Sequence, residues 1–597
     1  MDDKYFRNWV LFITVVFFCG FAVVAHKLCV EHLESPDDSS SLTRLYENTV
    51  LGPRGKIFDC NGTQHPMAMS LVTRLYFVDP HANSVRKEHR TNLVHVVANV
   101  AQALSLDVDE VWDKYMKIPP AEYDRILLNN DDPRLWEKNR SRNRRNVLKE
   151  SADEGVFAVI TNSALVSGIG IKNKVIRSYP EKRRMSHVVG FVNKPGIGSS
   201  GIELRYDSFL KGTDGRIEGE KDARRQEIVC RRSIDVPPIS GSDVYLTLDH
   251  NIQYEIEKDL RNAVEKFQAK GGWAIVERIK SGEILAMASF PDFEPEHYNN
   301  VNSNIWVNKA ISFNYEPGSI MKPIVAASAL NQGVINEDTL IDVGLNRVWY
   351  YCNKPLRDHV TGLVDVRKAL VKSSNIFFGK LGLMMGNDIL YRYLRAFNFG
   401  SKLGIDLGGE QYGILYQPKR WDKLKPTRIP MGQGIAVTGL QMVNAYACLA
   451  NDGVLMKPYV VSKIVSPNGK VIIENKPEVI GRPIRKEIAR SVRGMMIGIT
   501  RTGGTGKRAA VKGYTVAGKT GTAQKPVAGG YSQTEYYATF VGFVPAVKPV
   551  FAVLVTVDSP KPQHTGGYVA GPAFAKIAAA TARYLEIPPD DIQEEEE

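Results

Sequence analysis

The stretch that decides the fold is YEPGSIMKPIVAASALNQG, residues 315–333. A Pro-Gly pair interrupts whatever precedes it, and the apolar run that follows predicts a helix from Ser319 to Gln332, ended by Gly333. Ser319 and Lys322 then lie one turn apart on the same helical face. The serine also lies at the helix N-terminus, where free backbone N–H groups favour developing negative charge.

A serine one turn before a lysine indicates nucleophilic catalysis. A serine hydroxyl becomes a good nucleophile only when a neighbouring base takes its proton. The amine of Lys322 can be that base if burial or a second cation lowers its pKa. The S-x-x-K pattern is weak by itself, because both residues are common and an exposed helix face is the ordinary alternative.

Two further motifs strengthen the interpretation. SSN occupies residues 373–375 and KTGT occupies residues 519–522, in that order along the chain. S-x-x-K, S-D-N and K-T-G together are the signature of penicillin-binding proteins and class A β-lactamases. Ser374 stands where that signature has aspartate. The chain resembles the penicillin-binding proteins, the D,D-transpeptidases that cross-link peptidoglycan.

The resemblance implies acyl transfer through a serine ester. Ser319 would attack the carbonyl of a D-Ala-D-Ala peptide bond, with Lys322 as general base because burial and Lys519 oppose its charge. Ser373 would relay the proton to the leaving amine. Asn375 would hold Lys322 and the substrate amide.

The K-T-G motif predicts the binding of the substrate's end. Its run reads as a strand, whose backbone can pair with an extended peptide. Lys519 and Thr520 would bind the terminal carboxylate, and Gly521 would let the ligand approach the backbone closely. By the resemblance, the backbone N–H groups of Ser319 and Thr522 would form the oxyanion hole.

Composition narrows the remaining classes of function. The chain has 597 residues and a net charge of +12, with 43% hydrophobic residues, which is typical of a globular protein of two to four domains. The basic run at residues 138–145 is a solvated face or an anion-binding patch, and no nucleic-acid motif accompanies it. A glycine-rich stretch at residues 503–507 lacks the Walker spacing and predicts a flexible turn.

The cysteines argue against a metal site. They are scattered, without a C-x-x-C pair or a cluster of metal-ligand spacing, and no H-E-x-x-H occurs. We expect free thiols, no catalytic metal and no cofactor. The six positions are Cys19, Cys29, Cys60, Cys230, Cys352 and Cys448.

The N-terminus predicts attachment to the cell membrane. Residues 9–25 are apolar and uncharged, long enough for a transmembrane helix, with Lys4 and Arg7 before them. We favour an uncleaved signal-anchor over a cleaved signal peptide, whose apolar region is shorter. The basic residues place the N-terminus in the cytoplasm and the bulk of the chain outside the membrane.

The segment after this helix resembles the pedestal of monofunctional, class B enzymes. RGKIFDCNG at residues 54–62 resembles their opening motif, with Cys60 in place of the usual arginine. Its Asn-Gly pair predicts a hairpin turn. Further pedestal motifs contain His187 and Glu203, which we interpret as structural. No glycosyltransferase signature is present, which favours class B over the bifunctional enzymes.

The pattern of elements predicts an α+β fold. A strand and a helix from Ile252 precede a hairpin around a Lys-Ser-Gly turn, a long helical middle, more strands and a closing helix, as in an antiparallel sheet covered by helices. This matches the penicillin-recognising serine transpeptidase fold, with an all-helical subdomain, behind an elongated pedestal. The predicted order is cytoplasmic tail 1–8, transmembrane helix 9–25, pedestal 26–240, transpeptidase domain 241–587 and acidic tail 588–597.

Three functions compete. A cross-linking transpeptidase is favoured over a β-lactamase or carboxypeptidase, because no E-x-x-L-N segment lies between the second and third motifs. A non-catalytic sensor or division scaffold would not need all three motifs. Local sequence around residues 315–318 and 368–375 resembles the septal division type more than the elongation or sporulation types. The implied partners are peptidoglycan stem peptides, β-lactams, a membrane glycan polymerase and other division proteins.

Overall fold

The computed structural model describes residues 44–62, 66–78, 101–102, 106–111, 147–149, 169–194, 196–221 and 228–591. The chain divides into two compact units, which we describe separately. In the first unit, three antiparallel strands form a sheet in the order β1-β6-β7: β1 (Arg44–Val50), β6 (Gly215–Lys221) and β7 (Ile234–Val236).

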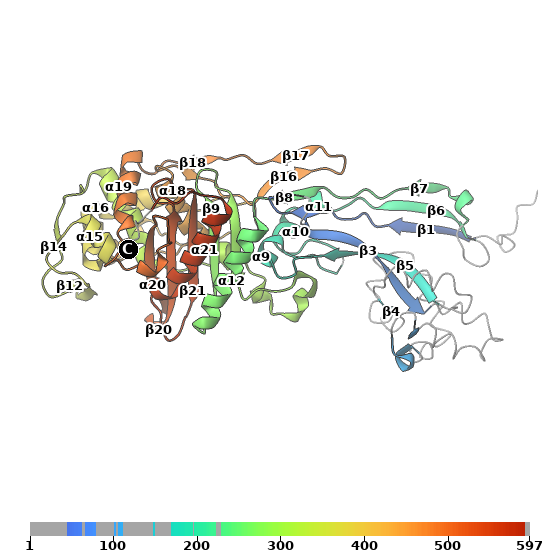
Figure 1. Ribbon diagram of the computed structural model, residues 1–597, viewed down its shortest axis with the longest axis horizontal. Coiled ribbons are helices and arrows are strands. Elements are labelled where there is room, and N and C mark those ends of the chain that lie inside the picture. The colour runs from blue at the N-terminus through green and yellow to red at the C-terminus, as the bar shows by residue number, and fades with distance from the viewer. Residues whose placement is uncertain are drawn as a thin grey trace, which may run out of the picture. The chain divides into compact units, whose positions relative to one another are not determined.

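The centre of the second unit is a five-stranded antiparallel sheet in the order β10-β9-β21-β20-β19 (Figure 1). Its strands are β9 (Gly271–Arg278), β10 (Ile284–Phe290), β19 (Ala517–Val527), β20 (Gly530–Val544) and β21 (Phe551–Asp558). The helices α12 (His250–Lys266) and α21 (Gly571–Tyr584) pack on one face, and α18 (Gly439–Ala450) packs on the other. The predicted hairpin, late strands and closing helix are therefore confirmed.

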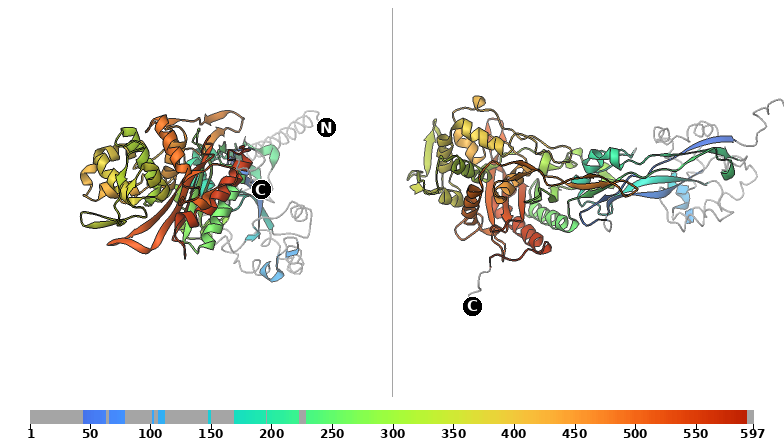
Figure 2. Two further views of the ribbon diagram at one scale, coloured as in Figure 1. Left: turned by 60° about the vertical axis from the view of Figure 1, so that its left-hand side comes forward. Right: turned by 90° about the horizontal axis from the view of Figure 1, so that it is seen from above.

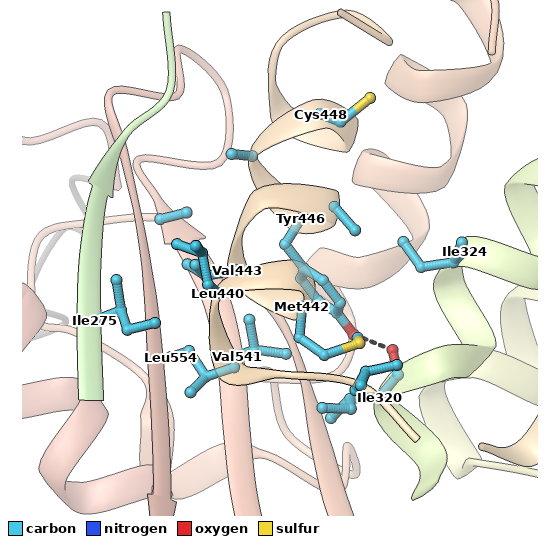
Figure 3. Packing of buried hydrophobic residues seen from close by; sticks show 14 of the residues in the cluster. Ile275, Ile320, Ile324, Leu440, Met442, Val443, Tyr446, Cys448, Val541 and Leu554 are labelled. Atoms are coloured by element: carbon cyan, nitrogen blue, oxygen red, sulfur yellow. Dashed lines mark hydrogen bonds between the residues drawn. The ribbon is translucent and has the colours of Figure 1, made fainter. Parts of the chain in front are cut away.

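Alternation along the central strands divides the core in two. In β9, Ala274 and Val276 join the cluster beneath α12 and α21, whereas Trp273 and Ile275 join the cluster beneath α18. Because side chains of a strand point alternately to opposite faces, a strand covered on both faces is apolar throughout. Figure 3 shows the α18 side of this core.

A second, seven-stranded sheet carries the pedestal-like segment of this unit. Its hairpin of β2 (Ile57–Phe58) and β3 (Pro66–Val78) confirms the turn predicted from Asn-Gly. β2 also pairs in parallel with β8 (Asp243–Leu246). The remaining strands are β4 (Val147–Lys149), β5 (Ile169–Ser178), β16 (Val461–Val465) and β17 (Val471–Glu474). Three short helices, α9 (Ser186–Val189), α10 (Gly201–Arg205) and α11 (Asp207–Leu210), pack in sequence, with α9 against β10 of the central sheet and α11 against β8.

The buried carboxylate of Glu203 explains the basic residues of this segment. It is fully buried and accepts from Arg54 at 2.9 Å and from Arg177 at 2.7 Å. A buried charge is tolerated when it is paired and hydrogen-bonded. His187 likewise forms a 2.8 Å hydrogen bond to the carbonyl of Ile305. Both contacts agree with the structural interpretation of these residues.

The sequence predicted an all-helical insertion between β10 and β19, and this prediction is wrong, because the insertion also contains short strands. Its helices are α13 (Lys309–Ser312), α14 (Lys322–Gln332), α15 (Val366–Lys372), α16 (Asn375–Ala396), α17 (Lys425–Arg428), α18 and α19 (Lys486–Ile497), but short two-stranded sheets lie between them. One is the hairpin of β12 (Val348–Tyr351) and β13 (Lys354–Arg357). Its aromatic and β-branched residues favour a strand, and both turn residues, Cys352 and Asn353, have positive φ, as a tight hairpin turn requires.

In the views of Figure 2, α12 (green) and α21 (red) lie side by side against the central sheet. α12 begins at His250, two residues before the predicted start, because the carboxylate of Asp249 caps the N–H groups of Asn251 and Ile252. The four cysteines in the described part of the chain are free, as expected.

Several predictions concern residues outside the described part of the chain. These include the tail 1–8, the membrane segment 9–25, the basic run 138–145 and most of the acidic tail 588–597. None of the helices that the structure does describe has the length and apolar character needed to cross a membrane.

Candidate active site

Ser319 lies in a tight turn that precedes the helix rather than in the helix itself. Residues Gly318–Met321 form a 3₁₀ turn, and α14 begins at Lys322. The N–H of Lys322 donates to the carbonyl of Ser319, and Pro323 has no N–H with which to make the longer α-helical bond to it. The predicted end at Gly333 is confirmed by its left-handed conformation.

The turn is held on both sides of the serine. Before it, Gly318 donates its N–H to the carbonyl of Gly432 at 3.1 Å. After it, the buried hydroxyl of Tyr446 on α18 donates to the carbonyl of Ile320 at 2.8 Å (Figure 3). The central sheet supports α18 from below, so the position of Ser319 is tied to the core of the domain.

Lys322 is fully buried beneath this turn. Its Nζ donates to the carbonyl of Ser373 at 2.6 Å, to Oγ of Ser373 at 3.1 Å and to Oδ1 of Asn375 at 2.8 Å. Burial, and next the charge of Lys519, hold the pKa of Lys322 well below its usual range, while Asp358 opposes them. Within the described residues no hydrogen bond joins Nζ of Lys322 to Oγ of Ser319, so the side-chain contact expected from their spacing is replaced by contacts to the second motif.

The strained backbone of Ser373 explains how this one residue accepts two hydrogen bonds from Lys322. It ends α15 in the left-handed conformation, with φ of 60°. Few residues other than glycine adopt this conformation, and those that do cluster at functional sites. The bend lets the carbonyl and the hydroxyl of the same residue face one amine.

Ser374 does not take part in this contact. Its hydroxyl caps α16, accepting from the N–H of Phe377 at 3.1 Å, and bonds to the carboxylate of Asp358. Asp358 is 6% exposed and also accepts from the N–H of Ile376 at 2.8 Å. The middle position of S-S-N is therefore a helix cap, for which serine is well suited.

Asn375 joins the second motif to the β12–β13 hairpin. Its Oδ1 accepts from Lys322, and its Nδ2 donates to the carbonyl of Arg357 at 3.0 Å. The side chain is half-buried. Both ends of the amide are thus fixed, and the orientation of Asn375 follows from its partners.

The third motif lies on β19, the edge strand of the central sheet. Lys519 pairs with Val541 of β20, and its side chain is fully buried. Among the described residues its Nζ forms hydrogen bonds only to the carbonyl and the hydroxyl of Thr520, at 3.3 and 3.4 Å. Burial lowers the pKa of Lys519 to about 7. An edge strand leaves backbone groups free to pair with an extended peptide.

Packing gives one reason for the glycine at position 521, while the approach of a ligand to its backbone stays a prediction. A Cβ there would lie 3.0 Å from Cγ2 of Ile320 and 3.2 Å from the carbonyl oxygen of Pro317. The absence of a side chain lets β19 lie directly against the turn that carries Ser319. The nucleophile and the third motif are therefore neighbours.

Two loops form hydrogen bonds to side chains of β19. Thr520 donates its hydroxyl to that of Thr505 at 3.1 Å, and Thr522 accepts from the N–H of Gly566 at 3.1 Å. Thr505 belongs to the glycine-rich stretch predicted as a flexible turn; it is a turn, but it borders the candidate site.

The residues from the three motifs thus form one site. It combines a serine at a tight turn, a buried lysine of lowered pKa and a strand edge that bears a second buried lysine. Such a site can take a proton from a hydroxyl, bind an extended peptide and receive an anionic group.

The comparisons agree with this geometry. Residues 272–579, more than half of the chain, match the model of the penicillin binding protein transpeptidase domain, and residues 49–246 match that of the penicillin-binding protein dimerisation domain. The chain belongs to the class B penicillin-binding proteins. The three motifs predicted a peptidoglycan D,D-transpeptidase, and the pedestal motifs predicted class B; both predictions are confirmed.

Relatives of this penicillin-binding protein share about a third of its residues. It is 36% identical to "Probable peptidoglycan D,D-transpeptidase PenA" of Neisseria meningitidis, over 71% of this chain and 72% of that one. It is 34% identical to "Stage V sporulation protein D" of Bacillus subtilis, over 71% and 66%. It is 31% identical to "Peptidoglycan D,D-transpeptidase FtsI" of Escherichia coli, over 93% and 88%.

A solved structure has the same fold. Penicillin Binding Protein 2X of Streptococcus thermophilus superposes with a TM-score of 0.72 at 24% identity, over 91% of this chain and 80% of that one. At this identity the likeness shows the fold alone.

Sequence reasoning missed the residues that hold the penicillin-binding protein's motifs in place. Asp358, Thr505, Gly432 and Tyr446 lie in segments without a catalytic pattern, far from their partners in the chain. An indirect signal was Ser374, which stands where the family signature has aspartate.

Proposed function

We propose that this protein cross-links peptidoglycan stem peptides by acyl transfer through Ser319. The main support for this proposal is the environment of Lys322, a buried amine of lowered pKa that donates hydrogen bonds to Ser373 and Asn375. A neutral amine beside the serine accepts the hydroxyl proton as Oγ attacks the carbonyl of D-Ala-D-Ala. The C–N bond then breaks, and the terminal D-Ala leaves with the proton returned through Ser373.

The second half of the reaction reverses these steps. An amine of another stem peptide attacks the ester carbonyl and gives its proton to Lys322. The ester C–O bond breaks, and Ser319 recovers its proton. In both halves the N–H groups of Ser319 and Thr522 stabilise the negative oxygen. Lys519 and Thr520 bind the terminal carboxylate of the donor in the first half only, because that carboxylate leaves with the terminal D-Ala. The packing of Gly521 against the nucleophile turn supports this common oxyanion site.

Covalent labelling tests the nucleophile. β-Lactams acylate the same serine, so labelled penicillin followed by peptide mapping should find the label on Ser319, and Ser319→Ala should abolish it. Lys322→Arg should also be inactive, because arginine keeps the charge but does not give up its proton. Wild-type labelling in either variant would overturn the assignment. A non-catalytic sensor is distinguished by the same assay with peptides, since it would be labelled but release no D-Ala.

We also infer a role in septal wall synthesis during division. The support is local sequence at residues 315–318 and 368–375, which resembles the septal type. The similarity to a protein called "Stage V sporulation protein D" favours a sporulation role as the second candidate. Depletion of the protein from growing cells should give filaments with unfinished septa; normal division with failed spores would favour the second role, and rounded cells an elongation role.

Membrane attachment is a further proposal. It rests on the apolar residues 9–25, with the cytoplasmic tail before them and the catalytic part outside. Salt washing should leave the protein in the membrane, and external protease should digest its catalytic domain in spheroplasts. A glycan polymerase and other division proteins in the same membrane are the proposed partners, to be sought by crosslinking in the intact membrane.

A further inference from the structure

Arg428, at the end of α17, lies where segments bordering the candidate site meet. Its Nη2 is 3.5 Å from the carbonyl oxygen of Pro355 in β13. Two residues along the same strand, the carbonyl of Arg357 holds Asn375. Four residues after Arg428, Gly432 accepts the N–H of the residue before the nucleophile. The guanidinium therefore lies near the site, on the side of Asn375.

The placement of Arg428 is set by tight packing beneath it. A Cβ on Gly382 of α16 would lie 2.0 Å from the carbonyl oxygen of Pro426, so α17 lies directly on that helix. The hydroxyl of Thr427, fully buried, donates to the carbonyl of Leu424 at 2.7 Å. The backbone that carries Arg428 has little freedom to move away.

Arg428 has no acidic partner among the described residues. No carboxylate of that part of the chain lies within ion-pair distance of it, and burial lowers its pKa, opposed by the hydroxyl of Tyr531. That hydroxyl is itself directed to Glu316, at 3.3 Å from Oε1. A half-buried guanidinium offers five donors in a planar fork that suits a carboxylate. Most of that capacity is unused here.

The route of the donor peptide leads toward Arg428. If Lys519 and Thr520 hold the terminal carboxylate, and the scissile carbonyl lies between the N–H groups of Ser319 and Thr522, the rest of the peptide continues along β19 toward Pro526. Pro526 pairs with Tyr531 of β20, whose hydroxyl is the group that opposes the fall in the pKa of Arg428. At about 3.3 Å per residue, four residues of strand from Thr522 to Pro526 cover roughly 13 Å, or several peptide residues.

We propose that Arg428 binds a carboxylate of the donor peptide on the N-terminal side of the scissile bond, and so selects acidic stem peptides. This inference rests on the proposed transpeptidase function. It makes Arg428 a specificity-determining residue, in contact with substrate but distant from the reacting atoms.

Kinetics with matched peptides test the proposal. Two peptides ending in D-Ala-D-Ala would carry, two or three residues upstream, either a free side-chain carboxylate or its neutral amide. Release of terminal D-Ala gives kcat/KM for wild type, Arg428→Gln and Arg428→Lys. Lys425→Gln, on the same helix, is the matched control, because it removes an equal charge from a side chain that lies over Tyr416.

We expect wild type to prefer the acidic peptide by about tenfold or more, as a charged hydrogen bond is worth about 1.5–3 kcal/mol. Arg428→Gln should lose that preference through KM, Arg428→Lys should keep part of it, and Lys425→Gln should keep all of it. Acylation by benzylpenicillin should stay within about twofold in Arg428→Gln, which shows that the site is intact.

An equal loss on both peptides in Arg428→Gln would overturn the proposal, since it would indicate a structural role. If the wild-type protein reacts with penicillin and releases D-Ala from both peptides without preference, the role of Arg428 is overturned but the proposed transpeptidase function stands. Wild type that neither takes the penicillin label nor releases D-Ala would instead overturn the proposed function, and this inference with it.

Discussion

Asp358 provides the most direct test of how the second motif is organised. We consider Asp358→Asn, which removes the charge and places an amide among groups that need an acceptor. The carboxylate accepts from the N–H groups of Ile376 at 2.8 Å and His359 at 2.6 Å, and from the hydroxyl of Ser374. It is 6% exposed, so water does not readily replace a lost partner.

The cost follows from these contacts. One oxygen can still accept, but the NH₂ group faces other donors, so at least one charge-assisted bond, worth about 1.5–3 kcal/mol, is lost. The N-terminus of α16 also loses a favourable negative charge, worth about 0.3–1 kcal/mol. We expect a destabilisation of about 2–4 kcal/mol, or a fall in Tm of roughly 3–6 °C for a domain of more than 300 residues.

The variant should also change catalysis in a characteristic way. Asp358 is the group that raises the pKa of Lys322 against burial and Lys519. Its removal makes Lys322 easier to deprotonate, so the acid limb of the pH–rate profile for penicillin acylation should move to lower pH. Differential scanning calorimetry and stopped-flow acylation measure the two effects. A Tm within about 1 °C of wild type, together with an unmoved acid limb, would refute this account of Asp358.

Three further predictions concern other parts of the domain. Because Lys519 binds carboxylate only when charged and its pKa is about 7, KM for a carboxylate peptide should rise between about pH 6 and pH 9; a flat KM would contradict the clamp role. Burial raises the pKa of Glu277, which accepts a hydrogen bond from Asn444, from 4.5 to about 8. The carboxyl group therefore takes up a proton on folding, and its contribution to stability is lost as the pH rises from about 4.5 to about 8. Glu277→Gln should remove this part of the pH dependence of Tm, and the same curve of Tm against pH in the variant would contradict the prediction. Gly432→Ala places a Cβ 2.2 Å from the carbonyl oxygen of Gly318 at positive φ, so penicillin acylation should fall about tenfold or more, and a wild-type rate would show that the turn is not held there.

Local sequence patterns predicted the reaction class, and they predicted the class of fold that the structure shows. The spacing of S-x-x-K, the glycine stop of α14 and the K-T-G strand are local patterns, and local patterns follow from helix and strand periodicity. The order of strand-like and helical runs likewise predicted an antiparallel sheet covered by helices. The strands between the middle helices were missed, because such short pieces carry weak periodicity and β12 was visible only as four aromatic and β-branched residues before a turn.

Only the tertiary structure decided how the motifs are connected. Spacing placed Lys322 beside Ser319, but its hydrogen bonds go to a residue in a left-handed conformation, which no period of the sequence encodes. The roles that we assign to Asp358 and Arg428 depend on their contacts with other segments of the insertion, which the sequence does not reveal. Burial then sets the pKa values of Lys322 and Lys519, and burial depends on every element packed around a side chain, not on its neighbours in the chain.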